Sequence, residues 1–253
     1  MTYTILGTGN MAWFLGTRLK AAGFICKGVW GRSLKAANDL AKELRCQYIS
    51  DLASVEDKYD CCIVAVSDHA IAEVTRQLSF ENTVVIHTAG SKKLDILKAP
   101  NRGVVWLIYS ILKNDLPAHR NIPAVIEANT DQAKAATAKI ARAVSDMVHE
   151  VSREQREWLH LTAVIGNNFT NHLMAICEDI CKEQGVTFTL LLPILHQTFG
   201  RAIQMSPRAS QTGPARRGDT DTMQAQTKLL KEHPEYKKVY KAVSESISKM
   251  YED

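Results

Sequence analysis

The first chemical signature in the sequence is a glycine turn close to the N-terminus, Gly7-Thr8-Gly9-Asn10-Met11-Ala12. In this spacing the first glycine allows a sharp turn, the second lets the backbone approach a pyrophosphate, and the alanine lets the helix pack closely on the strand. The free N–H groups and the positive end of the following helix then face the phosphates. A short apolar run precedes the turn and a helical pattern follows it, which is the context that this motif requires.

We therefore expect a dinucleotide site at this turn, the alternative being a tight connection between strand and helix that binds nothing. The residues predicted to bind the dinucleotide are Gly7, Thr8, Gly9, Asn10 and Met11.

A second signature follows the next predicted strand, where the sequence reads Trp30-Gly31-Arg32-Ser33. Folds that prefer NAD place Asp or Glu at the end of this strand, and that carboxylate is absent here. The guanidinium of Arg32 and the hydroxyl of Ser33 instead suit a 2′-phosphate. We therefore predict NADP(H) as the cofactor, with Lys35 adding charge. In the alternative interpretation, Ser33 only caps the next helix and Arg32 is solvated.

Two further turns follow predicted strands at the same edge of the sheet, Val66-Ser67-Asp68-His69 and His87-Thr88-Ala89-Gly90-Ser91. Open α/β sheets bind ligands at the carboxyl ends of their strands. We expect Val66, Ser67 and His69 along the nicotinamide ribose, with His87 and Ser91 nearer the substrate. Hydride transfer to a C=O or C=N bond needs a proton donor, and His87 is our first candidate. The alternative is a histidine that only bonds to a neighbouring backbone group.

A long helical pattern over residues 153–184 contains a polar cluster among apolar residues. Its members are His160, Asn167, Asn168, Asn171 and His172. Seven residues, nearly two helical turns, separate His160 from Asn167, so the two share a face. Asparagine is a modest helix former, and locally costly choices tend to fall at functional sites. We predict catalytic roles for His160, Asn167 and Asn168, the alternative being that the amides bond between helices.

A third patterned segment, residues 211–219, reads Gln-Thr-Gly-Pro-Ala-Arg-Arg-Gly-Asp. Arg216 and Arg217 in this segment could receive a carboxylate or a phosphate, including one from a partner subunit. The alternative is a solvated basic loop.

The elements that must position these residues change in character along the chain. Short strand patterns alternate with helical patterns over residues 1–152, which predicts a doubly wound, mainly parallel Rossmann sheet with helices on both faces. Only helical patterns follow. We therefore predict two domains: an NADP-binding Rossmann domain over residues 1–152, and an all-helical domain over residues 153–253 for substrate binding and dimerisation.

The composition excludes several classes of protein. A net charge of +4 over 253 residues is too small to indicate a nucleic-acid partner. The apolar runs are shorter than the roughly 20 residues of a membrane span, and no signal peptide is evident. The six cysteines lack framework spacing, so we expect reduced thiols, no metal and a cytoplasmic protein. A metal at Cys177 and Cys181 would need two further ligands.

These motifs together resemble a known family. The glycine turn is similar to that of pyrroline-5-carboxylate reductases and F420-dependent NADP oxidoreductases. The motifs at residues 87–91, 167–172 and 211–219 resemble proteins that combine a Rossmann-like domain with a DUF2520 domain, over essentially the whole chain. The resemblance implies an NADP-linked oxidoreductase, a helical domain similar to the C-terminal domain of 6-phosphogluconate dehydrogenase, and a homodimer. It implies no settled substrate.

The sequence departs from related proteins at two places. Residues 109–112 read Tyr-Ser-Ile-Leu where the family tends to carry a Tyr-Pro-Leu-Gln segment. Related dehydrogenases also hold a lysine four residues before an asparagine of the long helix, and here Ala163 and Val164 occupy those places. These departures leave the activity and the substrate open.

We predict hydride transfer to or from a small, anionic substrate in the cleft between the two domains. One alternative is a non-catalytic NADP-binding sensor or scaffold that dimerises through its helical domain. Another is an imine reductase of the pyrroline-5-carboxylate type, for which we find no matching loop in the helical half. A role of F420 as a second redox partner stays open.

Overall fold

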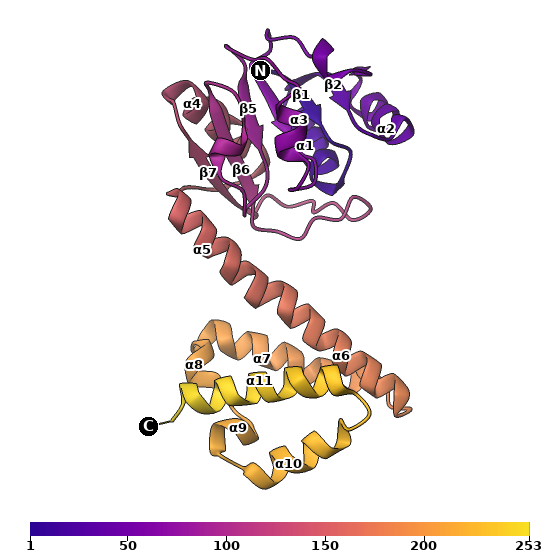
Figure 1. The fold of residues 1–253 in the computed structure, drawn as a ribbon, viewed down its shortest axis with the longest axis vertical. Coiled ribbons are helices and arrows are strands. Elements are labelled where there is room, and N and C mark those ends of the chain that lie inside the picture. The colour runs from indigo at the N-terminus through magenta and orange to yellow at the C-terminus, as the bar shows by residue number, and fades with distance from the viewer. Residues whose placement is uncertain (253) are drawn as a thin grey trace. The chain divides into compact units, whose positions relative to one another are not determined.

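The structure, a computed structural model, describes residues 1–252. Its first half is built on an eight-stranded sheet with the order β3-β2-β1-β4-β5-β6-β7-β8 (Figure 1). The strands are β1 (Thr2–Leu6), β2 (Ile25–Trp30), β3 (Gln47–Tyr48), β4 (Cys61–Val64), β5 (Val84–His87), β6 (Arg102–Leu107), β7 (Pro123–Ala128) and β8 (Met147–Glu150). All neighbours are parallel except β6 and β7. The predicted doubly wound, mainly parallel fold is confirmed.

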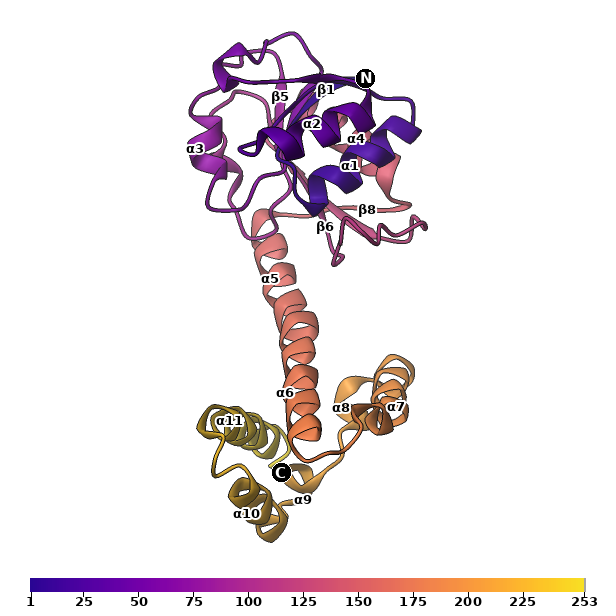
Figure 2. The same ribbon diagram turned by 90° about the vertical axis from the view of Figure 1, so that its right-hand side faces the viewer.

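Helices cover both faces of this sheet. The helices α1 (Asn10–Ala21), α2 (Leu34–Leu44) and α4 (Asp131–Val144) share one apolar cluster, while α3 (Ile71–Thr75) packs in another. Figure 2 shows α3 on the opposite side of the sheet from the other three. Side chains alternate along each strand, so Ile63 of β4 belongs to the first cluster and Val64 to the second. Strands buried on both faces read as continuous apolar runs, which explains why β4 and β5 were predictable.

Short 3₁₀ turns at Leu52–Ser54 and Leu94–Ile96 complete the connections of the sheet. The long helical pattern folds as α5 (Arg153–Ala163), a π-helical turn at Val164–Phe169, and α6 (Thr170–Glu183). The chain forms two compact units, Met1–Gly166 and Asn167–Asp253, so the division falls inside this pattern. Residues 153–166 thus pack with the sheet, and the predicted functional division at residue 152 stays a prediction.

The second unit contains only helices in the part of the chain that the structure describes. After α6 come the 3₁₀ turn Phe188–Leu191, α7 (Leu192–Gln204), α8 (Pro207–Ser210), α9 (Pro214–Arg217), α10 (Thr220–Leu229) and α11 (Pro234–Met250). The helices α8 and α9 are short, and α9 lies within the patterned segment 211–219. Each begins with a proline in its first turn, and Gly218 ends α9 at a positive φ of 67°.

Within residues 1–252, no helix has the length and apolar character to cross a membrane. No group of three or more His, Cys, Asp or Glu residues there is arranged to hold a metal ion.

Candidate functional site

The glycine turn connects β1 to α1 in a backbone conformation that needs Gly7. This residue has a φ of 126°, and its N–H donates a hydrogen bond to the carbonyl of Trp30 over 2.8 Å. A Cβ added at Gly7 would lie 2.2 Å from the carbonyl oxygen of Ala65, so no other residue fits without moving the backbone. The glycine thus lets β1, β2 and the end of β4 meet at one point.

Gly9, unlike Gly7, is not required by the backbone conformation. It caps the N-terminus of α1 without any side-chain hydrogen bond, and a Cβ added there would meet nothing within 4 Å. The helix N-terminus therefore opens onto free space that a side chain would fill. An open helix N-terminus with its N–H groups unused is what a pyrophosphate requires, so these residues fit a dinucleotide.

A cavity of about 550 Å³ extends from this turn along the carboxyl ends of β1, β2 and β4. The predicted binding residues that line it are Gly7, Thr8, Gly9, Arg32, Ser33, Val66, Ser67 and His69. The residues of this wall that the sequence analysis missed include Glu73, Val74 and Gln77. A period of three to four residues on a helix that begins at a sheet edge is the signal that could have found them.

Arg32 and Ser33 stand where β2 leads into α2. The hydroxyl of Ser33 accepts a hydrogen bond of 3.3 Å from the N–H of Ala36, so Ser33 does cap α2. Arg32 is exposed, and within residues 1–252 no acidic side chain forms an ion pair with it. The cavity wall therefore carries, at a helix N-terminus, a cation without an ion-pair partner among the described residues, with Glu73 elsewhere in the same wall.

Asn10 and Met11 do not line this cavity. The side-chain oxygen of Asn10 accepts a hydrogen bond of 3.1 Å from the N–H of Lys113, in the loop between β6 and β7. Met11 is partly buried and packs against the apolar cluster under α1. For these two predicted residues, it is the backbone N–H groups at the N-terminus of α1 that could bind a phosphate.

The turns after β4 and β5 are joined by side chains. The hydroxyl of Ser91 donates a hydrogen bond of 2.8 Å to a carboxylate oxygen of Asp68. The hydroxyl oxygen of Ser67 lies 3.3 Å from Nε2 of His69. The structure thus brings the predicted residues of both turns to one edge of the sheet.

His87 ends β5 with its side chain fully buried. Its Nδ1 accepts a hydrogen bond of 3.2 Å from the N–H of Ala89. Burial lowers the pKa of His87 to about 3, and the nearby Arg156 guanidinium acts in the same direction. The ring is therefore neutral near pH 7 and holds the following turn, which favours the alternative interpretation; its predicted catalytic role stays a prediction.

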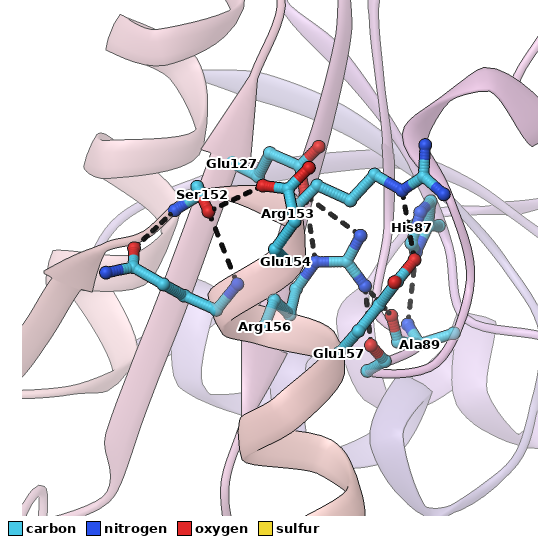
Figure 3. Close-up of polar contacts among 10 residues, drawn as sticks. His87, Ala89, Glu127, Ser152, Arg153, Glu154, Arg156 and Glu157 are labelled. Atoms are coloured by element: carbon cyan, nitrogen blue, oxygen red, sulfur yellow. Dashed lines mark hydrogen bonds and ion pairs between the residues drawn. The ribbon is translucent and has the colours of Figure 1, made fainter.

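Arg156 of α5 is a charged side chain with no exposed surface, and the sequence analysis missed it. Its Nη2 lies 2.8 Å from Oε2 of Glu127 on β7, and its Nη1 donates a hydrogen bond of 2.5 Å to the carbonyl of Gly90 (Figure 3). In the sequence, Arg156 is only an arginine within an amphipathic helical pattern, and such a pattern does not indicate this contact. The guanidinium fixes the turn after β5 to α5 and β7.

His160, one helical turn after Arg156, lies against the same turn. Its ring centroid is 5.5 Å from that of Trp106, and a Cβ added at Gly90 would lie 2.5 Å from His160 Cδ2. Unlike His87, His160 keeps part of its surface exposed. Gly90 therefore allows this histidine to approach the end of β5.

Asn167 and Asn168 belong to the second compact unit and lie in the π-helical turn. The side-chain amide of Asn167 donates a hydrogen bond of 3.1 Å to the side-chain oxygen of Asn168, and both residues are exposed. Single π-turns inside α-helices occur frequently at functional sites. The widened turn thus coincides with the asparagine cluster that the sequence analysis selected.

The arginines of the segment 211–219 differ in their contacts. The guanidinium of Arg216 lies 4.4 Å from the ring centroid of Tyr251, whereas Nη2 of Arg217 is 3.9 Å from a carboxylate oxygen of Asp219. Both arginines are exposed. Asp219 in turn accepts a hydrogen bond from the N–H of Thr222 and so caps α10.

Comparisons with known proteins bear on this site. Residues 2–90 match the family described as NADP oxidoreductase coenzyme F420-dependent, and residues 122–247 match the domain of unknown function DUF2520. The structure of a proposed NADP oxidoreductase from Bacteroides fragilis is 30% identical, with a TM-score of 0.89 and 98% of each chain covered. The chain belongs to the NADP oxidoreductases that carry a DUF2520 domain. The predicted family, and NADP(H) as the cofactor of that family, are confirmed.

More distant solved structures share the fold. A protein from Thermotoga maritima is 21% identical, with a TM-score of 0.74 and 98% of each chain covered. An imine reductase from Myxococcus stipitatus, solved in complex with NADP⁺, is 14% identical, with a TM-score of 0.63, covering 99% of this chain and 93% of that one. Among curated proteins, none matches the sequence.

Proposed function

We propose that the chain is an NADP(H)-dependent enzyme that transfers hydride to or from a small, anionic substrate. The observation that carries this proposal is the cavity in which an open helix N-terminus and Arg32, which forms no ion pair among the described residues, share one wall. The two features match two anionic parts of NADP, the pyrophosphate and the 2′-phosphate.

The residues of this cavity divide the binding between them. The backbone at Gly7 and Gly9, with the N-terminus of α1, would hold the pyrophosphate. Arg32 and Ser33 would hold the 2′-phosphate, the arginine through its planar fork of donors. Ser67 and His69 on the turn after β4 would border the nicotinamide ribose. When bound, the nicotinamide supplies or accepts the hydride.

We assign the proton transfer to His160 in preference to His87. His87 is fully buried and its pKa of about 3 keeps the ring neutral, so it carries no acidic imidazolium proton near pH 7. His160 is partly exposed beside Gly90 and is fixed by its contact with Trp106. Ser91, hydrogen-bonded to Asp68, is a second polar group at this edge.

The anionic character of the substrate is inferred from the second unit. Arg217 is exposed, with only a long ion pair of 3.9 Å to Asp219, and so retains donors for a carboxylate. The exposed amides of Asn167 and Asn168 could hydrogen-bond a polar substrate group. Reductases of imines and of pyrroline-5-carboxylate share the fold, which makes C=N compounds worth testing beside ketones.

A homodimer formed through the second unit is part of this proposal. In residues 167–252 the only buried apolar side chains are Ile176 and Ala215. By contrast, Leu190 and Ile203 are 72% and 86% exposed. Contiguous exposed apolar surface marks an interaction site, and a second copy would cover it. Sedimentation equilibrium tests this; a chain that stays monomeric at high concentration contradicts it.

A cytoplasmic location also remains our proposal. It is supported by the state of the cysteines, all six of which are free thiols in the structure. Proteins with this many unpaired cysteines are typical of a reducing compartment.

The test of activity is the loss of NADPH absorbance with a panel of 2-oxo acids and cyclic imine carboxylates. We expect turnover of at least one, and a loss of kcat of about 100-fold in His160→Asn with unchanged NADPH affinity. His196→Asn, an exposed histidine on α7, is the matched control and should keep the wild-type rate. Tight NADPH binding without turnover of any compound would favour the sensor or scaffold alternative. An active His160→Asn variant would refute the role of His160.

A further inference from the structure

The loop between β6 and β7, residues 108–122, lies against α1. Its N–H at Lys113 donates a hydrogen bond of 3.1 Å to the side chain of Asn10, the first residue of α1. Farther along the loop, the guanidinium of Arg18 donates hydrogen bonds to the carbonyls of Pro117 and His119. These contacts tie two points of the loop to the helix that follows the glycine turn.

The side chain of Lys113 lies over the first turn of this helix. Its Nζ is 5.5 Å from the ring centroid of Trp13, which is a favourable cation–π distance. Trp13 is the fourth residue of α1, so the ammonium group lies beside a side chain of the first turn of the helix. The first turn of α1 contains no acidic residue that would neutralise this charge.

We propose that Lys113 is a further ligand of the dinucleotide, and that its ammonium group binds the phosphates at the N-terminus of α1. A cation that lies close to a helix N-terminus adds to the attraction of the helix for an anion. The hydrogen bond to Asn10 gives that residue of the glycine turn a function, since it places the backbone of Lys113. The inference rests on the proposed function, because it requires the glycine turn to bind NADP(H).

The pyrophosphate is common to NADPH and NADH, whereas the 2′-phosphate is not. Lys113 should therefore contribute equally to the affinity for both nucleotides, while Arg32 contributes to that for NADPH alone. This difference separates the two cations experimentally.

The experiment is calorimetric titration of the full chain with NADPH and with NADH, for wild type and Lys113→Gln. We expect Lys113→Gln to weaken the binding of both nucleotides by a similar factor, about tenfold at low salt. Salt screens the interaction, so the difference from wild type should shrink as the ionic strength rises. Lys113→Arg, which keeps the charge, should restore most of the affinity.

Lys139→Gln is the matched control. Its Nζ lies 5.9 Å from the ring centroid of Phe24, so it too is a lysine over an aromatic ring. It lines a cavity with Met1 and Asp60, which precede β1 and β4, and therefore lies at the opposite edge of the sheet. Its replacement should leave both affinities unchanged.

Each other outcome overturns the inference. Wild-type affinity in Lys113→Gln would show that the lysine only stacks on Trp13. An equal loss in Lys139→Gln would reduce the effect to the net charge of the protein. An equal loss in Lys113→Arg would point to the shape of the loop. Wild type that binds neither nucleotide would refute the proposed function itself, whereas wild-type binding with an unaffected Lys113→Gln would refute the role of Lys113 alone.

Discussion

At the scale of single residues, the two glycines of the turn after β1 serve different purposes. Gly7 is required by the fold, because its φ of 126° and the carbonyl of Ala65 exclude a side chain. Gly9 is not required by the fold, because a Cβ there would meet nothing within 4 Å. The free space at Gly9 is explained if a ligand fills it.

This difference predicts that the same substitution at the two glycines affects different properties, nucleotide affinity at Gly9 and stability at Gly7. Gly9→Ala should fold with wild-type stability and lose NADPH affinity by about 10-fold or more, because the methyl group occupies the phosphate position. Gly7→Ala should lower the free energy of unfolding by about 1–3 kcal/mol through backbone strain. Thermal unfolding and NADPH titration of both variants check this. Wild-type NADPH binding by Gly9→Ala would contradict the assignment of the turn.

The burial of His87 predicts how the free energy of unfolding depends on pH. Its pKa is about 3 in the folded chain, against an ordinary value of 6.5. Between these values the unfolded chain binds a proton that the folded chain does not, so the free energy of unfolding falls as the pH falls, by about 1.4 kcal/mol per pH unit. The contribution is fully present above pH 6.5 and is lost progressively toward pH 3.

His87→Asn removes this contribution. We expect its free energy of unfolding, measured with urea between about pH 4 and pH 6, to depend less steeply on pH than that of wild type by this amount. Equal slopes in the two proteins would show that the histidine is not held neutral by the fold.

At the scale of elements, α5 is joined to the sheet by one buried cation. Arg156 pairs with Glu127, whose side chain is 15% exposed, and bonds to the carbonyl of Gly90. Because the turn after β5 borders the candidate site, this ion pair positions site residues without touching a ligand. Figure 3 shows the guanidinium between β7 and that turn.

Removing the guanidinium should therefore destabilise the chain strongly. We expect Arg156→Ala to lower the free energy of unfolding by about 3–5 kcal/mol, because it leaves the Glu127 carboxylate buried without a partner. The double variant Arg156→Met with Glu127→Gln should lose less, since no uncompensated charge is left. Urea titration measures both, and an equal loss in the two variants would argue against the ion pair as the cause.

The sequence predicts most of these elements and misses specific features of them. Helices α2 and α4 begin and end at the predicted residues because Ser33 and Thr130 are N-caps that the pattern reveals. The antiparallel pairing of β6 with β7 could not be predicted, since strand direction depends on the path of the loop between them. The π-helical turn at Val164–Phe169 also has no counterpart in the helical pattern.

The candidate site was predictable to a similar degree. Gly7, Gly9 and Arg32 were found because their motif has a fixed spacing along the chain. Glu73, Arg156 and Lys113 were missed, because only the folded chain brings them to the sheet edge, to a buried carboxylate and to α1. Local patterns identify a motif, whereas contacts between distant segments decide which residues complete it.

At the scale of the whole molecule, each compact unit has a distinct character. The unit Met1–Gly166 contains the apolar core and the cavity at the glycine turn. In the unit Asn167–Asp253 many large apolar side chains of the described residues are exposed, and only one, Ile176, is buried. A unit with so few buried apolar side chains gains most from a second copy, which is why we propose that the chain dimerises through it.

The central claim is that the cavity at the glycine turn binds NADP(H) and selects it through Arg32. Calorimetric titration of wild type and Arg32→Ala with NADPH and NADH tests this most directly. We predict that wild type prefers NADPH, and that Arg32→Ala loses about 10- to 100-fold in NADPH affinity without change for NADH. Equal affinity of wild type for both nucleotides would contradict the role of Arg32, and binding of neither would contradict the account as a whole.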